Sequence, residues 1–201
     1  IPGHLKSRAD FGLDEKQHLY LCAQSTIKFH PDVDGLFAHI LRGDDGGTVL
    51  VVEGDIPNWD SQVRRRWAQT IGDVKERIKF VPRLSPENFI ALQSVADVIL
   101  DTPHFSGGNT TYEAFAIGKP VVTLDSAFMR GRVTAGMYRI MNIEGCTAQS
   151  LTDYGRIALK LGMNSDYRRF IEVQIRERCE GLFERQEVVD GFVEYIKKVR
   201  T

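Results

Sequence analysis

The sequence predicts an α/β fold: a Rossmann-like, doubly wound parallel sheet with a helical tail at the C-terminal end. Short apolar stretches rich in β-branched residues alternate with amphipathic stretches along most of the chain. Such alternation gives a parallel sheet with helices on both faces. No internal repeat or low-complexity linker interrupts the sequence, so residues 1–201 are expected to form a single domain.

Strands and helices are each expected from a local pattern. The middle of TVLVVE at 48–53 is apolar throughout, which is typical of a strand covered on both faces. Val33, Leu36 and Phe37 begin an apolar stripe at helical spacing, and Pro86 suits the first turn of a helix. The predicted strands are 18–24, 48–53, 77–81, 97–101 and 120–124. The predicted helices are 33–41, 59–71, 86–95, a helix that starts near Thr110, 129–141, and 151 to the end.

The composition excludes several classes of partner. Hydrophobic residues make up 42%, charged residues 26%, and the formal net charge is -1, so no basic field is available for nucleic acid. No apolar run reaches the roughly 18 residues that span a bilayer. The three cysteines, Cys22, Cys146 and Cys179, lack metal-ligand spacing, which favours a reducing, cytoplasmic location. A chain that begins at Ile1 is expected to be part of something longer.

A glycine-rich turn, SGGNTTYE, follows the predicted strand at 97–101. Its two glycines let a ligand approach the backbone closely. The residues after them start a helix whose first N–H groups lack partners within the helix, and the positive end of the helix dipole makes this an anion site. The residues concerned are Gly107, Gly108, Asn109, Thr110 and Thr111.

Glu113 has two interpretations. Its carboxylate is suited to accept hydrogen bonds from the two hydroxyls of a ribose. Alternatively, Thr110 and Glu113 form a capping box, in which each side chain satisfies the other residue's backbone N–H. Spacing does not decide between a ligand contact and a cap.

Four stretches resemble one family, in the family's order. They are LYLCAQSTIKFHPD at 19–32, VPRLSPENFIALQSVADVILDTP at 81–103, GGNTTYEAFAIGKPVVT at 107–123 and RGRVTAGMYRIMNI at 130–143. Together they resemble the C-terminal lobe of GT-B glycosyltransferases, and specifically the O-GlcNAc transferase (SPINDLY-like) family and its bacterial relatives.

The resemblance implies an activity. Members transfer a sugar, with inversion and without a metal, from a UDP-sugar such as UDP-GlcNAc to a protein Ser or Thr hydroxyl. Their C-terminal lobe holds the donor, so this chain is expected to bind UDP. The N-terminal lobe and the tetratricopeptide repeats fall outside this sequence, and so does the general base. The chain is therefore expected to be inactive by itself.

The resemblance also assigns residues to the phosphates. Lys28 matches a lysine beside the diphosphate, where an ammonium stabilises the leaving group. Gln24 is similar to a family amide, with a spacing that differs by about one residue. Thr110 and Thr111 match a threonine pair at the phosphates, and Asn109 replaces a histidine.

Further matches concern the nucleoside. Leu84 is expected to offer backbone groups to uracil, and Phe89 lies where the family places a ring against the base, although Phe89 is also suited to the core. Glu113 matches the ribose-binding acid if one residue is deleted. Leu92 replaces an arginine found in some members. Arg132 matches a recurring arginine that either contacts ligand or supports its loop.

No metal site is predicted. Asp32 and Asp34 imitate a D-x-D motif, but they follow Pro31 at a helix start, where acidic residues complement the dipole. The five histidines lack ligand spacing.

Two other functions stay open. A GT-B lobe could serve a nucleotide-sugar epimerase, and a catalytically silent lobe could serve as an interaction module. Lys28 with Thr110 and Thr111 argues against the silent module, which has no use for a diphosphate clamp. Those residues do not separate transfer from epimerisation.

Overall fold

The described part of the protein, residues 6–199 of a computed structural model, is organised around six parallel strands. The strand order is β3-β2-β1-β4-β5-β6. The strands are β1 (His18–Cys22), β2 (Gly47–Val52), β3 (Ile78–Val81), β4 (Val98–Leu100), β5 (Val121–Leu124) and β6 (Thr147–Ala148). The predicted doubly wound α/β fold is confirmed, and the sequence missed only the two-residue β6 among these strands.

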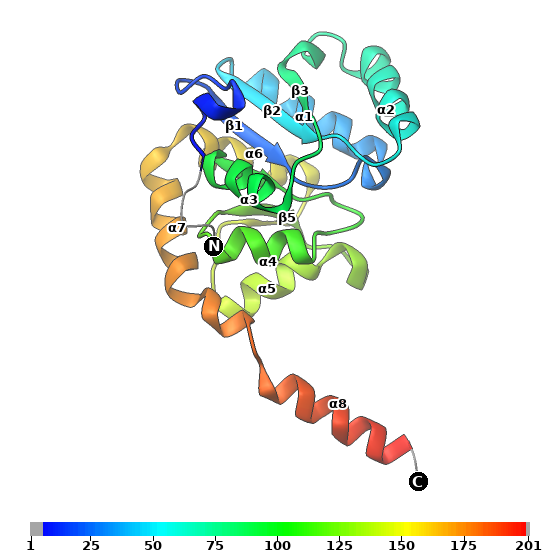
Figure 1. Cartoon of the computed structure of the whole chain (residues 1–201), viewed down its shortest axis with the longest axis vertical. Helices are drawn as coiled ribbons and strands as arrows, with labels where there is room; N and C mark the ends of the chain where they lie inside the picture. The colour runs from blue at the N-terminus through cyan, green and yellow to red at the C-terminus, as the bar shows by residue number, and fades with distance from the viewer. Residues whose placement is uncertain (1–5, 200–201) are drawn as a thin grey trace.

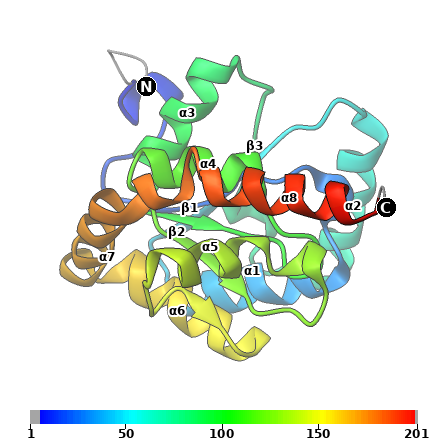
Figure 2. The same cartoon turned by 90° about the horizontal axis from the view of Figure 1, so that it is seen from below.

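Helices cover both faces of the sheet. Figure 2 shows α3 and α4 on one side of it and α1 and α6 on the other. The helices are α1 (Pro31–Gly43), α2 (Pro57–Thr70), α3 (Pro86–Val95), α4 (Asn109–Ala116), α5 (Val133–Met141), α6 (Leu151–Met163), α7 (Ser165–Arg178) and α8 (Gln186–Val199). Within residues 6–199, each helix is too short or too polar to cross a membrane.

Two expected helices are more broken than the sequence indicated. The segment predicted as one helix from 129 to 141 is a 3-10 turn, Met129–Gly131, followed by α5. The C-terminal region is divided into three helices and a 3-10 turn, Cys179–Leu182. The last helix, α8, projects away from the sheet (Figure 1), and its apolar side chains are exposed.

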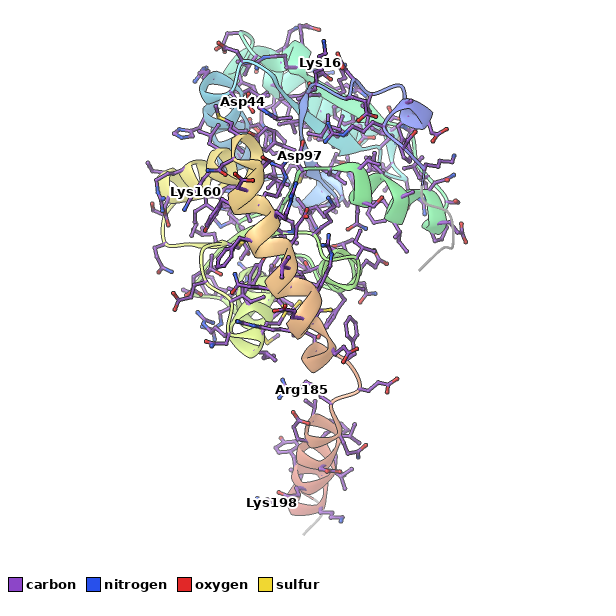
Figure 3. The ribbon with its side chains drawn as sticks, turned by 90° about the vertical axis from the view of Figure 1, so that its left-hand side faces the viewer. Lys16, Asp44, Asp97, Lys160, Arg185 and Lys198 are labelled. Carbon is purple, nitrogen blue, oxygen red and sulfur yellow. The ribbon has the colours of Figure 1, made fainter. Side chains whose placement is uncertain are left out.

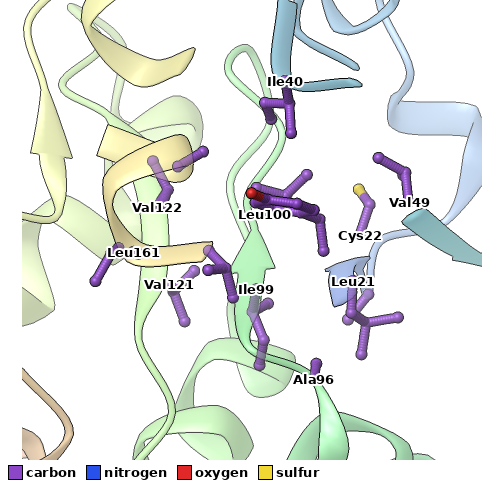
Figure 4. Packing of buried hydrophobic residues seen from close by; sticks show 14 of the residues in the cluster. Leu21, Cys22, Ile40, Val49, Ala96, Ile99, Leu100, Val121, Val122 and Leu161 are labelled. Atoms are coloured by element: carbon purple, nitrogen blue, oxygen red, sulfur yellow. The ribbon is translucent and has the colours of Figure 1, made fainter. Parts of the chain in front are cut away.

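The core lies between the sheet and its covering helices. Leu21, Val49, Leu100 and Val122 come from four neighbouring strands and are almost completely buried. Ile40 from α1 packs against the same cluster (Figure 4). Both faces of these strands are covered by other parts of the protein, which explains why their sequences are continuous apolar runs.

Two buried carboxylates stabilise the edge of the sheet where the strands begin (Figure 3). Asp97 accepts hydrogen bonds from the Leu19 N–H at 2.8 Å and the Arg8 guanidinium at 2.9 Å, and it pairs with Arg168 at 3.0 Å. Asp44 accepts from the Tyr20 hydroxyl at 2.7 Å. A buried charge is stable only with such partners. Since protein groups occupy both carboxylates, we assign this end of the sheet a role in supporting the fold.

Candidate functional site

The candidate site lies at the opposite edge, where the strands end. The strand order reverses between β1 and β4, which makes the loops after these two strands the expected ligand-binding crevice. The first loop contains Gln24 and Lys28, and the second contains the glycine-rich turn. Residues about 80 apart in sequence therefore meet at one place.

A chain of hydrogen bonds joins the two loops. The Lys28 ammonium donates to Gln24 Oε1 at 2.8 Å and to the Ser106 carbonyl at 3.3 Å. Gln24, only 5% exposed, donates through Nε2 to the Thr110 hydroxyl at 2.8 Å. Three residues that the sequence assigned to the phosphates thus lie in contact.

Lys28 is held in a partly desolvated position. Its ammonium lies 4.7 Å from the centre of the Phe105 ring, a cation–π contact. Burial lowers the pKa of Lys28, and the negative charge of Asp101 opposes that shift. The side chain is half-buried at the site and does not extend into bulk water.

The start of α4 is not capped by a side chain. Gly108 is the N-cap residue, and its carbonyl accepts from the Thr111 and Tyr112 N–H groups at 2.9 and 3.1 Å. Among the described residues, the N–H groups of Asn109 and Thr110 have no hydrogen-bond acceptor. The alternative capping box of Thr110 and Glu113 does not form, because the helix begins too early for Thr110 to be the N-cap.

Gly107 is required by close packing. A Cβ there would lie 2.5 Å from Thr111 Oγ1, 2.7 Å from Gln24 Nε2 and 2.9 Å from Thr110 Oγ1. Gly107→Ala is therefore expected to lower the free energy of unfolding by about 1–3 kcal/mol, the usual result of overpacking. Chemical denaturation measures this loss.

Gly108→Ala is the matched control for that substitution. A Cβ at Gly108 meets no atom within 4 Å. A loss of stability at Gly108 as large as that at Gly107 would contradict the packing explanation.

Thr111 lies behind the helix start. It is 2% exposed, and its hydroxyl is 3.0 Å from Thr134 Oγ1, which is in turn 2.9 Å from Ser106 Oγ. The side chain predicted to reach phosphate is thus directed into the interior here. Its hydroxyl supports the loop from inside, while that of Thr110 lies at the crevice.

Asp101, which the sequence analysis did not select, organises the glycine-rich loop. This 3% exposed carboxylate accepts from Ser106 Oγ at 2.5 Å, the Gly107 N–H at 2.7 Å, Thr123 Oγ1 at 2.8 Å and the Thr102 N–H at 2.9 Å. Burial raises the pKa of Asp101, and hydrogen bonds from Ser106, Gly107 and Thr123 oppose the rise. The sequence did contain a signal for this role, since Asp101 is an acidic residue that directly follows an apolar strand and precedes a glycine-rich turn.

A cleft of about 230 Å³ lies beside Gln24. Leu84 and Phe89 also line this cleft, so the two residues predicted to contact the base border one open space. Phe89 also packs partly against the core, as the second interpretation of its ring expected, and its contact with the base stays a prediction. Leu92, by contrast, is fully buried.

Glu113 is half-buried on α4 and receives one long hydrogen bond, 3.4 Å, from Gln93 Nε2 on α3. Arg132 lies at the start of α5 with an exposed side chain, and within residues 6–199 that side chain makes no hydrogen bond or ion pair. Neither support of its loop nor contact with the crevice is visible for Arg132.

The D-x-D pair does not form a joint site. Asp34 is buried and accepts from Arg66 at 2.8 Å and from the Trp67 indole at 2.8 Å. Asp32 instead lies beside His30 and His104, and the ligand atoms of these three residues are within 4.8 Å of one another. Sequence spacing missed this cluster because 72 residues separate Asp32 from His104.

The six-stranded parallel sheet with helices on both faces defines a Rossmann-like α/β domain, whose switch-point crevice contains an uncapped helix start and a half-buried lysine. Comparison with protein families gives the particular group. The model described as "Glycosyl transferase family 41" matches residues 3–190, and the chain belongs to this family. The resemblance to a GT-B lobe of the O-GlcNAc transferase type is confirmed.

Two curated relatives are similar over most of the chain. The probable UDP-N-acetylglucosamine–peptide N-acetylglucosaminyltransferase SEC of Arabidopsis thaliana is 24% identical over 87% of this chain and 18% of its own length. The UDP-N-acetylglucosamine–peptide N-acetylglucosaminyltransferase of Caenorhabditis elegans is 23% identical over 81% of this chain and 14% of its own length. The chain thus spans less than a fifth of these relatives.

Solved structures share the fold. A K341M mutant of the O-GlcNAc transferase of Thermobaculum terrenum has a TM-score of 0.79 at 24% identity, over 89% of this chain and 36% of that one. HepE of Anabaena, in complex with UDP and glucose, has a TM-score of 0.66 at 13% identity, over 93% of this chain and 51% of that one.

Proposed function

We propose that residues 1–201 are the donor-binding lobe of a longer glycosyltransferase that uses a UDP-sugar. The single observation that carries the proposal is the Lys28–Gln24–Thr110 chain beside the uncapped start of α4. Two unpartnered N–H groups, a helix dipole and an ammonium are the donors that a diphosphate needs. They converge at the switch point of the sheet, where this fold class binds nucleotides.

The parts of the donor have separate places in this proposal. The diphosphate lies against Asn109 and Thr110, with Lys28 beside it. The base enters the cleft next to Leu84 and Phe89. Glu113 accepts hydrogen bonds from the ribose hydroxyls.

In the proposed transfer reaction, negative charge develops on the leaving diphosphate. An acceptor hydroxyl attacks the anomeric carbon, the bond from that carbon to the diphosphate oxygen breaks, and UDP leaves with an additional negative charge. Lys28 stabilises that charge at the place where a divalent ion acts in other transferases. Because attack comes from the face opposite the leaving group, the anomeric configuration inverts.

The names of the relatives support a finer proposal. Both curated relatives are named as UDP-N-acetylglucosamine–peptide N-acetylglucosaminyltransferases, so we infer that the donor is UDP-GlcNAc and the acceptor a protein. The resemblance to the O-GlcNAc transferase family adds a Ser or Thr hydroxyl as the acceptor group and a cytoplasmic location to this proposal. The general base and most of the acceptor site belong to another lobe. The lobe alone binds UDP and does not catalyse transfer.

Titration of the chain with UDP in the presence of a chelator tests donor binding. We expect saturable binding, and we expect Lys28→Ala to weaken it about 10- to 100-fold, the equivalent of losing a charged hydrogen bond of about 1.5–3 kcal/mol. Lys16→Ala is the control, since Lys16 is exposed and precedes β1 at the other edge of the sheet (Figure 3). Equal affinities of the two variants would remove Lys28 from the site.

UDP affinity is also expected to depend on pH. The diphosphate binds the protonated lysine, so the contribution of Lys28 to affinity is constant below its pKa and is lost as pH rises through it. Because burial lowers that pKa below the ordinary 10.5, the fall begins at lower pH than for an exposed lysine. Calorimetry between pH 7 and pH 10 measures the profile, and a Lys28→Met variant with the same profile would contradict this assignment.

A further inference from the structure

Three potential metal ligands meet on the surface, close in sequence to Lys28 and Ser106 of the candidate site. His30 and Asp32 lie at the start of α1, and His104 lies in the loop after β4. Asp32 Oδ2 is 2.7 Å from His104 Nε2 and 3.4 Å from His30 Nδ1. The two imidazole rings are 4.3 Å apart between centroids.

These separations are close to those of a metal's coordination shell. Ligand atoms bound at about 2.0–2.1 Å around a tetrahedral ion are about 3.3 Å apart. All three ligand atoms lie within 4.8 Å of one another. The side chains of His30, Asp32 and His104 are 52%, 34% and 46% exposed, which leaves them room to rotate toward a common ion.

Hydrogen bonding within the cluster satisfies it only partly. His104 has a good partner in Asp32, but the His30 nitrogen accepts only a 3.3 Å bond from the Asp32 N–H. A nitrogen that accepts from this N–H carries no proton, so His30 Nδ1 does not donate to Asp32 Oδ2, which lies 3.4 Å away. An ion at the centre would use the lone pairs of all three atoms at once.

We propose that His30 Nδ1, Asp32 Oδ2 and His104 Nε2 bind a divalent transition-metal ion of the zinc class. Two imidazole nitrogens and one carboxylate oxygen suit zinc, whereas Mg²⁺ and Ca²⁺ prefer oxygen ligands. The positive end of the α1 dipole is unfavourable for a cation, and the negative charge of the Asp32 carboxylate offsets it. The exposed side leaves the fourth position to water.

Bound there, the ion fastens two loops of the proposed donor site. His30 follows Lys28 by two residues, and His104 precedes Ser106, which accepts from Lys28, by two. The ion would also fix Phe105, whose ring lies over the Lys28 ammonium. Its ligands differ from the residues proposed to hold UDP, so the metal site and the donor site can be tested separately.

The test uses the 201-residue chain after removal of metals with a chelator. Co²⁺ absorption in the visible range reports coordination, and Zn²⁺ at micromolar concentration competes with it. We expect one saturable site that Mg²⁺ does not occupy. His30→Ala, Asp32→Asn and His104→Ala should each weaken binding at least about tenfold, since even residues that only orient ligands cost that much.

His39→Ala is the matched control, because it removes an exposed histidine of α1 outside the cluster. Circular dichroism shows that each variant is folded, and Zn²⁺ should raise the melting temperature of the parent and of His39→Ala but not of His104→Ala. No saturable site, or full affinity in His104→Ala, overturns the proposal. UDP binding is measured separately, with and without Zn²⁺: no UDP binding in either condition would count against the proposed function, whereas Co²⁺ coordination alone decides the metal site.

Discussion

Asp101→Ala is expected to lower the free energy of unfolding by at least about 3 kcal/mol and to abolish UDP binding. The substitution removes one acceptor that serves four donors, among them the Gly107 N–H at 2.7 Å and Ser106 Oγ at 2.5 Å. Each buried donor left without an acceptor costs about 1–3 kcal/mol. Chemical denaturation gives the stability, and calorimetry at low temperature gives the affinity for UDP.

The loss of binding has a geometric cause. Gly107 and Ser106 set the path of the loop into α4, and the Ser106 carbonyl accepts from Lys28. Without Asp101 the loop loses the hydrogen bonds from the Thr102 and Gly107 N–H groups and from Ser106 Oγ that hold it relative to the helix start. If Asp101→Ala remains folded and binds UDP with parental affinity, the loop does not depend on this carboxylate.

Asp97→Ala is expected to cost about 3–5 kcal/mol of unfolding free energy while leaving UDP affinity intact in the folded protein. Asp97 pairs with Arg8 at 2.9 Å and with Arg168 at 3.0 Å. Removal of one partner from a buried ion pair leaves uncompensated charge, which accounts for a loss of that size. Both arginines are less than a fifth exposed, so water does little to compensate them.

The two aspartates make a matched pair. They flank β4, Asp97 before it and Asp101 after it, so both substitutions remove a buried carboxylate from the same strand. We expect both variants to be destabilised, but only Asp101→Ala to lose UDP binding. That result would show that the ends where the strands finish bind the ligand, whereas the ends where they begin support the fold. A loss of UDP affinity in folded Asp97→Ala would contradict this division.

Most of the fold could be predicted because its signals are local. The apolar β-branched runs predicted five strands, and both ends of each lie within two residues of the observed ends. Thr147–Ala148 escaped because two residues carry no periodicity. The break at Arg132 escaped because the segment from 129 to 141 reads as one amphipathic stretch, while the chain turns as a 3-10 helix before α5.

The candidate site was less accessible to sequence reasoning. Lys28 and Gln24 were found through family resemblance, and Thr110 also through the glycine-rich turn. The structure joins the three in one chain of hydrogen bonds. The inward turn of the Thr111 hydroxyl depends on Thr134, which is distant in sequence, so spacing could not reveal it. The same distance concealed the pairing of Asp32 with His104.

The meeting of β1 with β4 also bears on how the chain assembles. Tyr20 pairs with Val98 and Leu21 with Ile99, so this central seam closes a loop of many residues, whereas β1 and β2 are joined through one helix. Closing a long loop carries an entropic penalty before any contact rewards it. A nascent or partly refolded chain can therefore contain half a sheet and still lack a ligand crevice, and the recovery of UDP affinity during refolding would report the moment at which the two halves join.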